Sequence, residues 1–299
     1  DCVVVPRGLG SAPVRAPLFF VAAALIAVCP VSIDAQVTRV EITKRISPVP
    51  STELTGRAGP YEHLQGRIHG ELDPADPHNR IIQDIGLAPR NARGRVEYVA
   101  TFSLMKPVDL ARASGVLMYS VVNRGNGAAT PSPEGHISLV SGWQGDVVPT
   151  DVNQTIRVPI ARQAGGAPVT GPVLARFSDL PVGTTTASIR LGSMGTAAYP
   201  PETLDTAKAR LTFHTAETAR GVTGPVETVR SSDWAFADCR ETPFPGRPDP
   251  ARVCVKGGFA PARVYEVVYT AKDPLVLGIG LAATRDIVSF FRHAPAQGT

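Results

Sequence analysis

The chain has 299 residues, of which 43% are hydrophobic and 19% charged, so it can bury a core and is not a disordered chain. Its formal net charge of +4 is scattered along the sequence and only 6% of residues are aromatic. These values exclude the basic stripe with stacking aromatics that a nucleic-acid-binding surface needs. Twenty-eight glycines and twenty-eight prolines predict many turns and short strands.

Residues 1–35 have the pattern of an export signal peptide. Two arginines precede an apolar run over residues 18–28, which is too short to span a bilayer comfortably. A stretch ending at Ala35 offers a cleavage site before Gln36. An uncleaved membrane anchor is the alternative, and a lipid anchor on Cys29 is disfavoured because a bulky valine precedes it. We therefore expect a secreted or periplasmic protein with no stable membrane insertion after cleavage.

Strand patterns dominate residues 36–150, which we expect to form the N-terminal strands of the core. Residues 37–42 predict a first strand, residues 64–72 alternate between apolar and polar side chains, and residues 96–104 alternate most clearly. The histidines show no metal-binding spacing, so we expect neither a metal ion nor a cofactor.

A continuous apolar run over residues 116–122 is typical of a strand covered on both faces, as in the centre of an α/β sheet. The loop that follows it contains Asn123, Arg124, Gly125 and Asn126. Its glycines allow a sharp turn that points backbone amides outward. In an acyl-transfer enzyme these amides could be oxyanion donors, and an ordinary surface turn is an equally good alternative.

Residues 151–262 change character, because short strand patterns are separated by Gly, Pro and Thr. We expect a β-rich, sandwich-like insertion here. Export would remove the two N-terminal cysteines and leave Cys239 and Cys254 as an even pair in an oxidising compartment. No histidine or cysteine between them suggests a metal site, so we predict a disulfide. Two unrelated free thiols are the alternative.

The C-terminal residues 263–299 are expected to return to the core. Residues 264–269 form an apolar, β-branched run that predicts a strand. Asp273 and Pro274 follow, and they resemble an N-cap and the first position of a helix. Apolar residues at helical spacing then predict a helix over residues 275–292.

Several stretches together carry a resemblance that runs from about Val37 to His293. They are residues 59–62, 73–77, 87–92, 94–98, 123–126, 141–146 and 264–274. In this order they resemble a family of large bacterial secreted proteins with an α/β-hydrolase domain. The resemblance implies an α/β fold: the N-terminal portion of an α/β-hydrolase fold, interrupted by the β-rich insertion.

The same resemblance implies where a site would lie. Residues 116–122 would be the central strand before the oxyanion loop, with Trp143 and Gln144 lining the substrate. The helix over residues 275–292 would precede the nucleophile elbow, G-x-S-x-G, which is absent from this sequence and is expected beyond Thr299. No catalytic side chain is therefore expected here, and the short, proline-containing stretch 128–135 puts the oxyanion geometry in doubt.

Two functions follow as expectations. The first is an exported serine-hydrolase-like protein that acts on an ester or related acyl bond, with a small-molecule ester as substrate of the full-length protein, and that is inactive as this fragment alone. The second is a secreted, non-catalytic β-rich binding module on a degenerate hydrolase scaffold.

Overall fold

The computed structural model describes residues 2–3, 36–50, 58–189, 196, 198–215 and 217–293, with backbone alone for residues 2 and 3. The described chain is mostly β-strand arranged in several sheets, and α1 (Ile279–His293) is its single α-helix. The expected α/β-hydrolase fold is therefore wrong. Short strands joined by Gly- and Pro-rich connections fill the places where that fold would alternate strands with helices.

The first unit is a seven-stranded sheet in the order β1-β5-β6-β4-β3-β2, with β7 paired to β4. Strands β5 and β6 are parallel and all other pairs in this sheet are antiparallel. The strands are β1 (Cys2–Val3), β2 (Val37–Ile46), β3 (Tyr61–Leu72), β4 (Val96–Pro107), β5 (Leu117–Ser120), β6 (Ile137–Ser141) and β7 (Ile156–Arg157). The alternating patterns at residues 64–72 and 96–104 are thus confirmed as strands.

Strand β5 lies near one edge of this sheet, and it does not form the expected central strand. Only the two residues of β1 pair beyond it. Of the apolar run 116–122, four residues form the strand, and Val121 is 55% exposed. The prediction was wrong because a short apolar run carries no information about its sheet neighbours.

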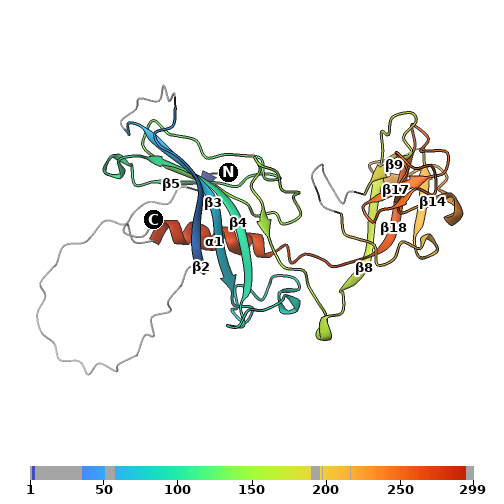
Figure 1. The fold of residues 1–299 in the computed structure, drawn as a ribbon, viewed down its shortest axis with the longest axis horizontal. Coiled ribbons are helices and arrows are strands. Elements are labelled where there is room, and N and C mark those ends of the chain that lie inside the picture. Colours follow the sequence, from blue (N-terminus) through green and yellow to red (C-terminus); the bar gives the residue numbers. More distant parts are fainter. Residues whose placement is uncertain are drawn as a thin grey trace, which may run out of the picture.

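Helix α1 covers the inner face of the sheet and crosses behind β2, β3 and β4 (Figure 1). Ile279, Ala283 and Ile287 repeat every four residues on one helical face and are fully buried. On the sheet, the Tyr98 ring occupies the space that a side chain at Gly70, its cross-strand partner, would fill. The shared apolar core therefore fixes the helix to the inner face.

The start of α1 differs from the prediction. Asp273 has a left-handed φ of 60° rather than an N-cap conformation, and Leu275 forms a bridge with Ile160. Val276 donates its backbone N–H to the carbonyl of Pro159 at 3.0 Å. Pairing with another segment therefore holds residues 275 and 276 outside the helix, and a turn at residues 277–278 leads into α1 at Ile279.

The second unit contains a four-stranded sheet, β13-β10-β18-β8, and a three-stranded sheet, β14-β17-β9. These strands are β8 (Thr170–Phe177), β9 (Thr186–Ser188), β10 (Arg210–His214), β13 (Glu227–Val229), β14 (Trp234–Ala235), β17 (Arg252–Val255) and β18 (Val264–Lys272). Both sheets contribute to one apolar core, so the unit is sandwich-like. Strand β18 pairs with β8 and β10, so the chain returns to the first unit after Lys272 rather than at residue 263.

Smaller elements complete the chain. Two-stranded ribbons join β11 (Glu217–Thr218) to β12 (Gly221–Val222) and β15 (Ala237–Asp238) to β16 (Arg247–Pro248). The 3₁₀ helices are η1 (Ile85–Leu87), η2 (Leu110–Arg112), η3 (Ala164–Gly166), η4 (Thr206–Lys208) and η5 (Ser231–Asp233). Figure 1 shows the two units side by side, and the start of β8 and the end of β18 lie on the side of the second unit toward the first.

Cys239 and Cys254 form a disulfide, with Cα atoms 5.8 Å apart. The predicted pairing is confirmed. The bond connects β17 to the segment that follows β15, and it encloses the proline-containing loop between them. Closing a loop of this length stabilises the folded chain by roughly 3 kcal/mol in the chain-entropy model.

Candidate functional site

The loop at residues 123–126 and the segment that follows β6 meet in the structure. The backbone N–H of Arg124 donates to Gln144 Oε1 at 2.6 Å, and Trp143 Nε1 donates to the carbonyl of Val122 at 2.6 Å. Because β5 and β6 are parallel, their carboxyl ends lie at the same edge of the sheet, and the loops that follow them are neighbours. The resemblance had assigned these two segments to one site, and the fold brings them together.

Within this site Arg124 is the central residue. Its Nη1 lies 3.0 and 3.1 Å from the two carboxylate oxygens of Asp146, and its Nη2 donates to Thr196 Oγ1 at 2.8 Å. We call Arg124, Gln144, Asp146 and Thr196 the Arg124 cluster. Thr196 lies between β9 and β10 in the sequence, so the cluster ties the first unit to a segment of the second.

The loop backbone has little freedom. Arg124 and Gly125 have successive left-handed φ values of 52° and 76°, and Asn126 N–H donates to the carbonyl of Asn123 at 3.0 Å. A Cβ on residue 125 would lie 2.5 Å from the carbonyl oxygen of Gln154, so glycine is required there. The loop is a tight, packed turn.

The electrostatics of the cluster are balanced within the protein itself. Asp146 neutralises the Arg124 guanidinium, and burial raises the pKa of the nearby Tyr199 hydroxyl, which the Asp146 charge raises further. Gln144 accepts the hydrogen bond of the Arg124 amide, one of the amides that the sequence offered as possible oxyanion donors beside the alternative of an ordinary turn. In this arrangement the amide stabilises the loop and does not face an open substrate site.

Two serine–histidine pairs are present among the described residues. Ser103 Oγ lies 2.7 Å from His63 Nε2, and Ser114 Oγ lies 2.7 Å from His136 Nδ1. Ser103 is fully buried, and burial lowers the pKa of His63, with a smaller contribution from Lys44. In the described part of the chain, neither histidine has a carboxylate hydrogen-bonded to its other ring nitrogen. Neither pair is therefore a serine–histidine–acid triad.

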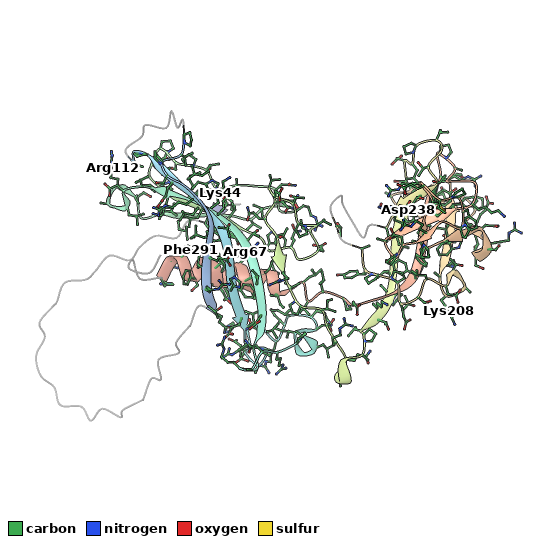
Figure 2. All side chains as sticks on the ribbon, viewed as in Figure 1. Lys44, Arg67, Arg112, Lys208, Asp238 and Phe291 are labelled. Carbon is green, nitrogen blue, oxygen red and sulfur yellow. A yellow bond between two sulfur atoms is a disulfide. The ribbon has the colours of Figure 1, made fainter. Side chains whose placement is uncertain are left out.

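The outer face of the first sheet carries a different candidate site. The strand registers place Arg39, His69, Val99 and Arg157 in one row across β2, β3, β4 and β7. Glu71 and Glu97 form the next row. Side chains in one row of a sheet lie on the same face, so these polar groups are gathered opposite helix α1. Figure 2 labels Arg67 over these strands and Phe291 on the helix.

A hollow of about 340 Å³ lies at the end of this face, and we call it the β4–β7 groove. Its walls come from the loop after η1, from β4, and from β7 with the residues that follow it. The lining residues are Pro89, Arg90, Asn91, Glu97, Tyr98, Val99, Arg157, Val158 and Pro159. A second hollow of about 210 Å³ shares Glu97, Tyr98, Val99 and Arg157 with it. The volume of the groove is within the range of small-molecule sites.

The carboxylates near the groove already accept hydrogen bonds from neighbouring side chains, whereas two of its arginines have no carboxylate partner among the described residues. Asn91 Nδ2 donates to Glu97 Oε1 at 2.9 Å and to Glu71 Oε2 at 3.0 Å. Arg93 also pairs with Glu71, and this hydrogen bond holds the pKa of Glu71 below its usual range. Among the described residues, no carboxylate pairs with Arg90 or Arg157. The groove therefore offers two guanidinium groups without an acid partner, one on β7 and one on the loop after η1.

Sequence reasoning did not find this groove. The alternation over residues 96–104 indicates that Glu97 and Val99 share a face. The position of Arg157 beside Val99 depends on the pairing of β7 with β4, which no local pattern reveals.

Neither a helix able to cross a membrane nor a grouping of three potential metal ligands occurs in the described ranges of the chain. No protein-family model, curated protein or solved structure matches the sequence.

Proposed function

We propose that this protein is an exported, non-catalytic binding protein whose small-molecule ligand occupies the β4–β7 groove. The observation that carries the proposal is the groove itself, a hollow with one guanidinium group from strand β7 and one from the loop after η1, neither paired with an acid. The disulfide and the export-signal pattern of residues 1–35 support a location outside the cytoplasm.

Position on a sheet makes this site suitable for binding. Val99 and Arg157 are cross-strand partners, and β4 is held on its other side by the twelve-residue strand β3. Side chains on paired strands keep their spacing without a ligand, so little ordering entropy is lost on binding. Half-buried Val99 adds apolar contact area.

The experiment is a ligand-observed NMR screen of the purified chain against small acids, esters and amines, repeated with Val99→Trp. An indole at this position fills the groove, so we expect bound compounds to lose their saturation-transfer signal. Val226→Trp is the matched control, because Val226 is an exposed valine in the second unit. Binding that survives Val99→Trp would show that the ligand occupies another place.

Hydrolysis of an ester or related acyl bond is a second candidate, favoured by the meeting of the 123–126 loop with Trp143 and Gln144. This reaction needs a nucleophile and a base at that sheet edge, and the described residues bring no accessible serine–histidine–acid set there. We expect the purified chain to release no p-nitrophenol from short-chain esters. Turnover above the rate of a heat-denatured sample would favour hydrolysis over binding alone.

A further inference from the structure

We propose that the ligand of the β4–β7 groove is a small amphiphilic carboxylate, whose carboxylate binds Arg90 and Arg157 and whose apolar body lies against Pro89, Val99 and Pro159. This inference rests on the proposed function and adds the chemical class of the ligand. It starts from the absence of an acid partner for either guanidinium within the described part of the chain.

Arginine is suited to this role because its planar guanidinium presents paired N–H donors that match the two oxygens of a carboxylate. Arg90 and Arg157 approach the groove from different walls, the first from the loop after η1 and the second from β7. A ligand between them can accept hydrogen bonds from both sides. Arg39, in the adjoining hollow, already contacts Glu41 and His69, so it is a weaker candidate.

The lining also discriminates against cations. Two arginines and one glutamate, Glu97, line the groove, and the Glu97 carboxylate already accepts from Asn91. An ammonium ligand would meet two like charges and only one carboxylate. A ligand carboxylate would meet two unpaired donors, so the field in the groove favours an anion.

The apolar lining determines the character of the ligand beyond its carboxylate. Pro89, Val99 and Pro159 contribute apolar surface. A hollow of about 340 Å³ accepts a short aliphatic chain or a single aromatic ring. An inorganic anion would leave this surface unused, so a carboxylate with an apolar body binds better.

The test uses three compounds of one shape and different charge: phenylacetate, its neutral methyl ester and phenethylamine, with inorganic phosphate as a fourth probe. Binding to the purified chain is measured by isothermal titration calorimetry at low and at high salt. We expect phenylacetate to bind at least tenfold more tightly than the other three. Its affinity should fall as salt rises, because exposed charges are screened.

Variants locate the contact. Arg90→Gln and Arg157→Gln should each weaken phenylacetate binding roughly tenfold, the scale of a lost charge-assisted hydrogen bond. Arg220→Gln is the matched control, because Arg220 is an exposed arginine in the second unit, and it should leave binding unchanged. Equal losses in all three variants would mean non-specific attraction and would overturn the inference.

The outcomes distinguish a failure of the proposed ligand class from a failure of the proposed binding function. If the ester binds as tightly as the acid and Val99→Trp abolishes both, the groove binds ligands but the anionic class is wrong. If phosphate binds as tightly as phenylacetate, the apolar contact is wrong. If no probe binds and the fragment screen is also empty, both proposals fail.

Discussion

The two units of this protein are built from similar strands but differ in how many buried polar atoms lack a hydrogen-bond partner. In the first unit, Tyr98 Oη, Arg124 Nε and Asp286 Oδ2 are buried without a hydrogen-bond partner; in the second, His214 Nδ1 is the corresponding atom among the described residues. Buried unpaired polar atoms are costly, and they concentrate at sites that serve purposes other than stability. This contrast is in keeping with the proposal that the ligand site lies in the first unit.

The second unit, by contrast, has the features of a stability core. The ring centroids of Trp234 and Phe236 lie 5.1 Å apart and those of Phe236 and Tyr269 lie 5.6 Å apart. A disulfide closes the adjoining loop. Asp238, labelled in Figure 2, pairs with Arg240 and Arg252 next to that bond. The two tryptophans, Trp143 and Trp234, lie one in each unit, so fluorescence of single-tryptophan variants can follow each unit separately.

The largest expected effect comes from the aromatic core of the second unit. Phe236→Ala should lower its free energy of unfolding by about 3–5 kcal/mol, because it leaves a cavity beside Trp234. Urea denaturation followed at Trp234, in a Trp143→Phe background, measures this loss. The transition followed at Trp143, in a separate Trp234→Phe background, should move by less than a third as much, and equal movement would show that the units unfold as one.

Removing the disulfide should have the next largest effect. Replacing Cys239 and Cys254 together by Ala should cost the second unit roughly 3 kcal/mol, because the unfolded chain regains the entropy of an open loop. Denaturation in oxidising buffer gives the value. Phenylacetate affinity is the internal control, because the groove lies in the first unit and should be unaffected.

Sequence patterns predicted the parts of this fold that depend on local spacing. The alternation at residues 96–104, the stripe of Ile279, Ala283 and Ile287, and the Cys239–Cys254 pair each follow from period or count. The sequence patterns did not predict which sheet a strand joins, because the apolar runs of β18 and β5 would suit the sheet of either unit. The resemblance placed the 123–126 loop and Gln144 at one site without predicting that Gln144 would accept from the Arg124 amide, whereas the groove required the register of β4 with β7.

A smaller effect, of opposite sign, is expected at Asp286 in the first unit. Asp286 belongs to helix α1 and is 5% exposed. Burial raises the pKa of its carboxyl group, Arg285 opposes the rise and Asp76 adds to it. The folded state therefore holds a proton that the unfolded state releases, and stability falls as pH rises from about 4 through the raised pKa.

Asp286→Asn removes this loss, so the free energy of unfolding followed at Trp143 should rise by about 1–2 kcal/mol at neutral pH. The gain should vanish below about pH 4, where both states of Asp286 are protonated. Arg285 donates to Asp286 Oδ1 at 2.8 Å and to the neutral amide of Asn79 at 3.1 Å, so Asn79→Ala, which leaves Asp286 in place, serves to check that the pH dependence belongs to Asp286. A gain that is constant with pH would contradict the assignment.

The smallest expected effect separates the two readings of the Arg124 cluster. Gln144→Ala removes the acceptor from the Arg124 amide, and a typical internal hydrogen bond contributes about 1 kcal/mol, so the first unit should lose that much stability. If the amide were a masked oxyanion donor, opening it would raise ester hydrolysis. We expect no p-nitrophenol release from the variant, because no described nucleophile faces the freed amide.

Gln154→Ala is the matched control: it removes a glutamine that accepts from Thr101 in the same region and leaves the Arg124 amide covered. Turnover in Gln144→Ala alone would move the functional site of this protein from the groove to the loop.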